Sequence, residues 1–342
     1  MEEIKLTQYS RGAGCGCKIA PAVLEEILTS EIDNVFDKNL LVGNETKDDA
    51  AVYDLGDGTA IISTTDFFMP IVDDAKTFGK VAAANAISDV YAMGGDPLMA
   101  IAILGWPVDK LPVALAKKVL EGAREICKQA GIMLCGGHSI DSAEPIFGLA
   151  VTGRGEIKNI KKNSSAKEGD LIFLTKPIGS GILSTALKRG VISNEHYLEL
   201  TSHITKLNST GSYLAKNSGI NAMTDVTGFG LLGHVIEMAD GSNTSVELYY
   251  DDIPVMEGVR EYLKLRMVPD ATFRNWNAVS KNVSFEKGIN VMEAFSLLPD
   301  PQTNGGLLIT CNPAEAEKIF TIKPIGKIVS RGEKTVIVKS SL

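Results

Sequence analysis

The chain has few cysteines, no long apolar run and no surplus of basic residues. Its five cysteines among 342 residues are too sparse, and odd in number, for a disulfide framework. Acidic residues outnumber basic ones by 42 to 34, which argues against non-specific binding of nucleic acid. Apolar stretches such as 98–104 are too short to span a bilayer, and residues 1–5 do not resemble a signal peptide. We therefore expect a cytoplasmic protein with neither nucleic-acid nor membrane partners.

Several familiar nucleotide-binding signatures are also missing. The chain contains no G-x-x-x-x-G-K-[ST] string and no H-R-D or D-F-G motif, which argues against a P-loop kinase and a protein kinase. One G-x-G-x-x-G string does occur, at 228–233, between a strand-like run and a helix, with Asp251 after the next strand. This pattern keeps an NAD-binding oxidoreductase as the alternative function. That alternative leaves Cys15 and Lys18 without a role.

Length and composition predict two folded domains. The chain is long for one core, and 44% of its residues are hydrophobic. A polar stretch at 158–169 is the best candidate for a boundary. We expect residues 1–18 to form a mobile glycine- and cysteine-rich arm, residues 19–156 an N-terminal α/β domain, and residues 157–342 a C-terminal domain.

Hydrophobic periodicity and turn residues predict the elements of both domains. Strands are expected at 59–65, 99–104, 132–135, 146–152, 171–175, 245–250, 305–311, 325–329 and 335–338. Helices are expected at 21–28, 75–93, 112–130, 179–188, 195–217, 229–238 and 313–320. The strand at 99–104 is interpreted as buried. Cys127, Cys135 and Cys311 are interpreted as small core residues.

The segment Gly12-Ala13-Gly14-Cys15-Gly16-Cys17-Lys18 is the first candidate for chemistry. A thiolate is the reactive form of cysteine, and the adjacent Lys18 cation favours it. Glycines let such a segment approach a substrate closely and leave again. Spacing alone leaves two other interpretations open: an incidental pair of cysteines, or part of a zinc site whose further ligands are missing.

Scattered aspartates are the second candidate. Asp48 and Asp49 follow a turn, Asp66 ends a strand, Asp89 lies within an apolar helix, and Asp225 precedes a glycine-rich turn. A carboxylate surrounded by apolar residues costs free energy unless it contacts a cation or hydrogen-bond donors. Mg²⁺ on a triphosphate takes a few carboxylates together with phosphate oxygens. Each aspartate taken alone also fits a helix cap or a turn residue.

Gly136-Gly137-His138-Ser139 directly follows a predicted strand and is interpreted as a turn. Backbone N–H groups in such a turn can hold phosphate, and His138 could add a donor. A plain strand-terminating turn remains the other interpretation. The other histidines are interpreted as structural.

Six strings in order resemble the selenophosphate synthetase (selenide, water dikinase) family, almost from end to end of the chain. They are GAGCGCK at 12–18, GNETKDDAAVYDLGDGTAIISTTDFFMPIVDD from residue 43, NAISDVYAMGG from 85, GGHSID from 136, TDVTGFGLLGH from 224 and DPQTNGGLL from 300. Asn304 departs from the pattern, because the family more often has serine there.

The resemblance implies a fold, an assembly and a reaction. The fold is that of aminoimidazole ribonucleotide synthetase, an α/β domain followed by an α+β domain, with N-terminal sheets of two chains paired into the barrel-like core of a homodimer. The reaction is ATP + selenide + water → selenophosphate + AMP + phosphate, which supplies activated selenium for selenocysteine and selenouridine. A selenium-delivery protein is a possible partner.

The resemblance also implies residue roles. Cys15 is the nucleophile or selenium carrier and Lys18 the catalytic lysine, while Cys17 is not required. The Mg²⁺ ligands fall on Asp49, Asp89 and Asp225. The ATP contacts fall on Lys18, Thr46, Lys47, Asp48, Asp66, Asp89, Gly137, His138 and Ser139. Two further alternatives remain: a purine-pathway synthetase on the same fold, and a nucleotide-binding regulator without catalysis.

Overall fold

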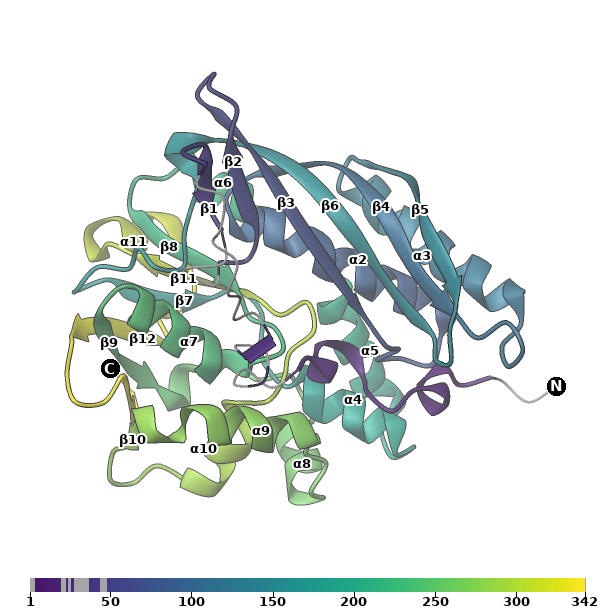
Figure 1. Cartoon of the computed structure of the whole chain (residues 1–342). Coiled ribbons are helices and arrows are strands. Elements are labelled where there is room, and N and C mark those ends of the chain that lie inside the picture. The colour runs from purple at the N-terminus through teal and green to yellow at the C-terminus, as the bar shows by residue number, and fades with distance from the viewer. Residues whose placement is uncertain (1–3, 20–22, 24–25, 28–36, 44–47, 342) are drawn as a thin grey trace.

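The computed structural model describes residues 4–19, 23, 26–27, 37–43 and 48–341. They form two sheet-based layers of structure with an N-terminal arm between them (Figure 1). The predicted helix at 21–28 falls largely outside the described residues. No helix in the described part of the chain is both long enough and apolar enough to cross a membrane.

The first sheet has six strands and is covered on one face by two helices (Figure 1). Its order is β1 (Leu40–Val42), β2 (Ala51–Asp54), β3 (Thr59–Phe68), β6 (Ile146–Glu156), β4 (Asp96–Trp106) and β5 (Met133–Asp141). The covering helices are α2 (Ala75–Ala92) and α3 (Val113–Gln129). Only β4 and β5 pair in parallel, joined by the crossover helix α3, and the other pairs are antiparallel.

Helix α2 is buried on nearly every side, which explains its alanine-rich sequence. It packs against the first sheet, against α3 and against β8 of the second sheet. Small residues permit these close approaches: a Cβ on Gly79 would lie 1.8 Å from the Val119 carbonyl oxygen of α3. The Asp74 carboxylate caps the helix by accepting from Thr77 N–H at 2.7 Å. Gly94, with φ of 80°, ends it.

The other face of the first sheet is open and apolar. Side chains alternate along a strand, so β4 points Ala100 and Ala102 toward the helices and Met99 and Ile101 outward. Met99 and Ile101 are each 46% exposed, which makes the expectation of a fully buried strand at 99–104 wrong. Two helices can cover only one face of the sheet. Met133 and Ile140 of β5 and Phe67 of β3 are exposed as well.

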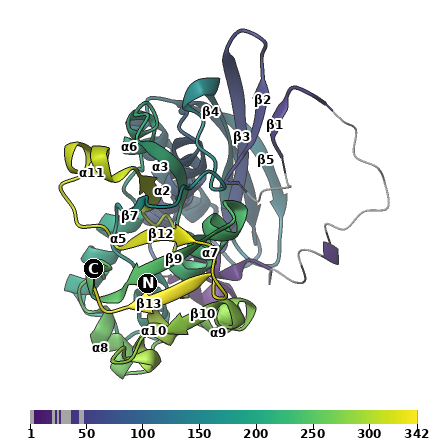
Figure 2. The same cartoon turned by 90° about the vertical axis from the view of Figure 1, so that its left-hand side faces the viewer.

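The second sheet has seven strands of mixed direction, and helices surround it (Figure 2). Its order is β10 (Val283–Phe285), β13 (Val336–Lys339), β9 (Thr244–Tyr249), β12 (Gly326–Ser330), β7 (Leu171–Leu174), β11 (Leu307–Cys311) and β8 (Ile220–Asp225). Its helices are α4 (Ser180–Lys188), α5 (Asn194–Ile204), α6 (Thr210–Leu214), α7 (Gly230–Gly241), α8 (Val259–Lys264), α9 (Asp270–Val279), α10 (Val291–Leu297) and α11 (Pro313–Ile319).

Most predicted elements are present, and three interpretations need correction. The predicted helix at 195–217 is two helices, α5 and α6, separated by residues 205–209. Gly136–Ser139 is not a turn, because these residues continue β5 in register with β4. Cys135 is exposed on that strand, whereas Cys127 and Cys311 are buried as expected.

Candidate active site

Strand β3 directs two polar side chains toward α2. Even-numbered residues of β3 face the helices, so Thr64 and Asp66 share that side with the buried Ala60 and Ile62. Thr64 donates a hydrogen bond from its hydroxyl to the Asp89 carboxylate of α2. Asp66 accepts one from the Asn85 amide. Asp66 lies within the strand, whose last residue is Phe68.

Helix α2 carries the matching polar face. Ser88 and Asp89 follow Asn85 by three and four residues, which places all three side chains on one side of the helix. All three are buried. Ser88 Oγ donates to Asp225 Oδ2 at 2.5 Å, and Asn208 Nδ2 donates to Ser88 Oγ at 2.8 Å. This face therefore joins the two domains through polar contacts.

The second domain adds Asp225, and the segment after β1 adds Asp49. Asp225 is the last residue of β8, opposite Leu307 of β11, and its side chain is buried. The Thr224 hydroxyl donates to Asp49 Oδ1 at 2.7 Å. Asp49, Asp66, Asp89 and Asp225, hereafter the carboxylate cluster, thus come from four different parts of the chain.

The carboxylate cluster holds more negative charge than its surroundings compensate. Burial, followed by repulsion from Asp225, raises the pKa of Asp49 well above its ordinary value. Burial and then the charge of Asp66 do the same for the pKa of Asp89. Burial also raises the pKa of Asp225, although the Ser88 hydroxyl opposes it.

A hard cation fits this arrangement chemically. Asp49 Oδ2 is buried and has no hydrogen-bond partner, so one carboxylate oxygen is left for a ligand. Oxygen donors of this kind suit Mg²⁺. Within the described ranges, no three acidic, histidine or cysteine side chains already stand close enough to hold a metal ion. A cation there would need further ligands, such as phosphate oxygens.

The N-terminal arm, described from residue 4 to residue 19, brings Cys15 to the same place. Cys15 is 2% exposed. Its backbone N–H donates to Thr303 Oγ1 at 3.0 Å, and its thiol donates to Asn85 Oδ1 at 3.3 Å. Asn85 Oδ1 also accepts from Asn304 N–H at 2.6 Å. One amide therefore connects the thiol, the carboxylate of Asp66 and the loop at 300–306.

Asn304 occupies a position that suits asparagine. Its φ is 48°, a left-handed conformation that asparagine tolerates better than most residues. Its amide donates to the carbonyls of Ile204 and Lys206 at 2.8 and 2.9 Å, which satisfies the end of α5. The departure from serine therefore adds contacts and leaves the backbone N–H for Asn85.

Lys18 completes the arm's contribution. Its Nζ lies 5.6 Å from the centre of the Phe229 ring. Desolvation opposes its charge, but Asp66, Cys15, Asp89 and Asp225 outweigh that effect and raise the pKa of Lys18. The lysine therefore stays protonated at neutral pH. It is a cation directed at the carboxylate cluster rather than a base.

The first glycine of the 228–233 string packs against the arm, whereas Gly230 packs against Pro299 and Gly233 against Phe229. A Cβ on Gly228 would lie 2.6 Å from the Cys15 carbonyl oxygen and 3.1 Å from Lys18 Cδ. The flanking strands β8 and β9 are not neighbours, because β11, β7 and β12 lie between them. A Rossmann unit needs adjacent parallel strands on either side of its helix. The NAD-binding alternative therefore finds no support in the fold.

The structure separates the other predicted residues. Asp48 Oδ1 accepts from Asn163 N–H at 2.7 Å, so Asp48 contacts the segment between the domains. Gly137, His138 and Ser139 lie on β5, and β6 and β4 separate that strand from β3. A single chain does not bring them to the carboxylate cluster. Thr46 and Lys47 lie outside the described residues.

Five residues at the site were not identified from the sequence. They are Thr64, Asn85, Ser88, Thr224 and Thr303. Asn85 and Ser88 carried a usable signal, because they are polar residues at helical spacing from Asp89 in an alanine-rich segment. The three threonines carried no such sequence signal, since their role depends on contacts between distant segments.

Two family models match consecutive parts of the chain. The N-terminal domain of AIR synthase related proteins matches residues 47–155, and the C-terminal domain matches residues 167–339. Solved structures share this fold at low identity. A thiamine monophosphate kinase from Aquifex aeolicus covers 94% of this chain and 96% of its own, with a TM-score of 0.65 and 18% identity. The hydrogenase maturation protein HypE in complex with ATP covers 97% and 93%, with a TM-score of 0.63 and 15% identity.

Curated relatives are far more similar. Selenide, water dikinase of Haemophilus influenzae (strain 86-028NP) is 52% identical and covers 99% of both chains. That of Escherichia coli O157:H7 is 56% identical and covers 98% of both. The protein of the same name from Shewanella sp. (strain W3-18-1) is 54% identical, covering 93% of this chain and 90% of its own. With its carboxylate cluster, its cysteine arm and these relatives, the chain belongs to the selenide, water dikinase family of the AIR synthase related fold.

Proposed function

We propose that the carboxylate cluster and the arm perform the selenide, water dikinase reaction, ATP + selenide + water → selenophosphate + AMP + phosphate. The observation that carries this assignment is the bridge made by Asn85. It links the Cys15 thiol to the carboxylate of Asp66 in a buried setting shared by both domains. In this proposal the selenium-carrying thiol and the nucleotide would lie side by side.

Asp49, Asp89 and Asp225 are the residues that would hold Mg²⁺ with ATP. Their raised pKa values mark uncompensated charge, and Asp49 Oδ2 has no other partner. When bound, the cation would neutralise phosphate charge and orient the chain of phosphates. Asp66 would stay hydrogen-bonded to Asn85 beside the nucleotide.

Lys18 and Cys15 would act on the transferred phosphoryl group. Phosphoryl transfer depends mainly on positioning and charge neutralisation. The protonated Lys18 stabilises charge on the γ-phosphate as selenide attacks the phosphorus, and the bond to the β-phosphate breaks to leave ADP. Water then cleaves ADP to AMP and phosphate. Cys15, held by Thr303 and Asn85, places the selenium species beside the γ-phosphate.

Residues 1–18 would act as a lid in this scheme. Cys15 is buried in the described arrangement, so a substrate reaches it only if the arm moves. Closure excludes water from the first transfer, which would otherwise hydrolyse ATP. The N-terminal domain, residues 19–156, and the C-terminal domain, residues 157–342, would form the two sides of the active site that the arm covers.

Phosphorus NMR tests this function. The protein is incubated anaerobically with ATP, Mg²⁺ and selenide. We expect a selenophosphate signal together with AMP and phosphate, all depending on selenide. Accumulation of ADP and phosphate without selenophosphate would contradict the assignment and indicate an ATPase. The same mixture without selenide is the control.

A homodimer explains the placement of Gly137, His138 and Ser139. These residues lie far from the carboxylate cluster of their own chain, beside the open apolar face made of Phe67, Met99, Ile101, Met133 and Ile140. Exposed apolar surface of this kind is typical of protein interfaces. A second copy packed on this face would form a barrel-like core and would bring its β5 toward the first copy's ATP.

Charge placed on the open face should prevent pairing. We expect Ile101→Glu to convert a dimer into a monomer, because a buried unpaired carboxylate opposes association. Multi-angle light scattering measures the mass, which should fall by about half, and activity should fall with it. Leu198→Glu, on an exposed apolar residue of α5, is the matched control and should stay dimeric. If the unsubstituted protein were itself a monomer, the proposed pairing of two chains through this face would be wrong.

A further inference from the structure

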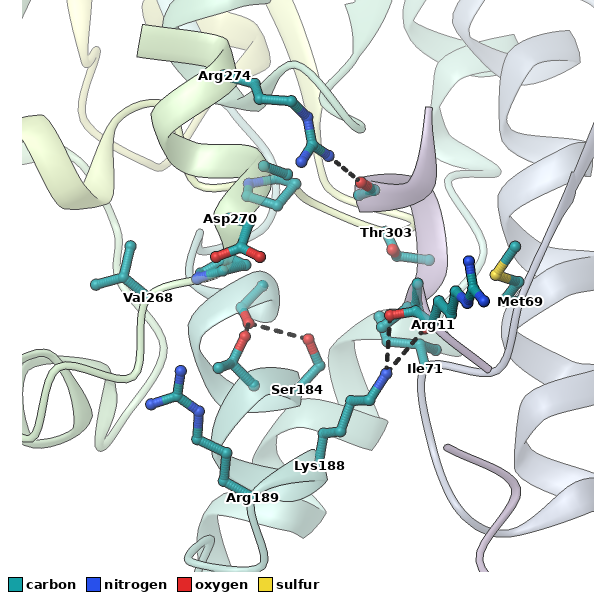
Figure 3. Close-up of a pocket in the computed structure, with 18 residues that line it drawn as sticks. Arg11, Met69, Ile71, Ser184, Lys188, Arg189, Val268, Asp270, Arg274 and Thr303 are labelled. Atoms are coloured by element: carbon teal, nitrogen blue, oxygen red, sulfur yellow. Dashed lines mark hydrogen bonds between the residues drawn. The ribbon is translucent and has the colours of Figure 1, made fainter. Parts of the chain in front are cut away.

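A hollow lies beside the N-terminal arm. Its volume is about 500 Å³, it opens to solvent, and it is bordered by α4, by the start of α9 and by residues of the arm between 11 and 16 (Figure 3). Pro301 and Thr303 form part of its wall. Because Thr303 also holds the Cys15 N–H, the wall of this cavity is one residue away from the thiol.

The cavity is strongly cationic. Its charged lining residues are Arg11, Lys188, Arg189, Arg274 and Asp270, four of them basic and one acidic. Figure 3 shows Lys188 and Arg189 projecting from α4 and Arg274 from α9 beside this space, whereas the Arg11 side chain extends toward Met69. Ser184 and Thr185 of α4 line the same wall, and their hydroxyls donate to the Gly181 carbonyl at 3.0 and 2.8 Å. Such a lining favours an anion.

Two of the four cations already hold the arm. Lys188 Nζ donates to the carbonyls of Ser10 and Arg11 at 2.8 and 3.1 Å. Arg274 Nη2 donates to the Gly16 carbonyl at 3.0 Å. These contacts fasten the arm to the second domain at both ends of the cavity.

Of the other two cations, only Arg189 has no acidic partner among the described residues. The Arg11 side chain is 97% exposed and forms an ion pair with Glu144 at 3.9 Å, so it points to solvent rather than into the cavity. Arg189 Nη1 meets only the Met267 sulfur, at 3.7 Å, and no acidic side chain pairs with it among the residues the structure describes. A guanidinium offers planar, paired donors that match the oxygens of a phosphate group.

We propose that this cavity binds a tetrahedral phosphate-class oxyanion, a phosphoryl product of the reaction, at Arg189 on the α4 wall. The inference rests on the proposed function, because that reaction forms two such anions, selenophosphate and phosphate, behind the arm. The cavity is large enough for either. A product that leaves past Cys15 meets these cations next, so the cavity retains it outside the closed arm.

Calorimetric titration of the full chain with inorganic phosphate tests the proposal without ATP, Mg²⁺ or selenide. We expect Arg189→Gln to weaken phosphate binding by about 10-fold, the usual loss of one charge-assisted contact. Lys264→Gln, on an exposed lysine of α8, removes the same charge elsewhere and should bind as the unsubstituted protein does. Equal affinity in the Arg189→Gln and unsubstituted proteins would overturn the site.

Two further measurements refine the result. Thiophosphate serves as a stable stand-in for selenophosphate: tighter binding of thiophosphate assigns the cavity to the selenium product, and tighter binding of phosphate assigns it to the coproduct. Lys18→Gln removes the cation assigned to the γ-phosphate and should leave the affinity of the cavity for phosphate unchanged. If Lys18→Gln abolishes phosphate binding while Arg189→Gln does not, phosphate binds at the nucleotide position and the proposal fails. Binding needs no turnover, so failure of the proposed function is recorded separately.

Discussion

Cys15→Ala is expected to lower the rate of selenophosphate formation by about 1,000-fold or more, because the selenium species is no longer held beside the γ-phosphate. Cys15 is the only arm side chain that reaches the Asn85 amide in the described chain, and it is held there from both its thiol and its N–H. ATP binding should persist, because the carboxylate cluster is unchanged. The rate is measured by phosphorus NMR and the binding by calorimetry.

Cys17→Ala is the matched control. It removes a thiol two residues away on the same arm, and we expect most of the activity to remain. Cys15→Ser tests the chemistry more finely, because a hydroxyl can still donate to Asn85 but is a far poorer nucleophile. Full activity of Cys15→Ala would rule out the nucleophile role. Loss of ATP binding in that variant would instead assign Cys15 to arm closure.

Asp225→Asn is expected to act in opposite directions on catalysis and on metal-free stability. Activity should fall by about 100-fold or more, because a ligand that neutralises phosphate charge is lost. The metal-free protein should become more stable at neutral pH. Burial raises the pKa of Asp225, so the native state holds a proton longer than the unfolded chain does. Stability is then lost as pH rises above the ordinary carboxylate pKa.

Denaturant unfolding with chelator and with Mg²⁺-ATP separates the two effects. The unsubstituted protein should gain stability from Mg²⁺-ATP, and without metal it should lose stability as the pH rises above the ordinary carboxylate pKa. The variant should show a smaller gain and a weaker pH dependence. Asp251→Asn, on an exposed aspartate of the second domain, is the control. If Mg²⁺-ATP stabilised Asp225→Asn as much as the unsubstituted protein, the assignment of Asp225 as a metal ligand would be contradicted.

Local patterns predicted the elements whose signals lie within the segment. The helix at 75–93 differs from α2 by a single residue, since its alanines favour helix and Gly94 ends it. Asp89 was identified because a carboxylate in an apolar helix requires a partner. Cys15 and Lys18 stood out through their glycine neighbours. In each case, the information was local.

Other features depended on distant partners. Gly136–Ser139 has the composition of a turn, yet pairing with residues 102–104 of β4 extends the strand through it. The helix predicted at 195–217 is broken because Asn208 donates its amide to Ser88 and Gly305. Asn85 was missed for the same reason: its three partners lie at residues 15, 66 and 304. No local window contains such information.

Strand β8 also fixes the order in which the protein can be completed. In the described chain β8 pairs only with β11, so Asp225 is held opposite Leu307. On the ribosome the first sheet, with Asp66 and Asp89, can form long before residue 307 is made. The repulsion that Asp225 adds to Asp49 and Asp89 therefore arises only when synthesis is almost finished. A nascent chain stalled before β11 would carry a folded first domain without a site that can hydrolyse cellular ATP.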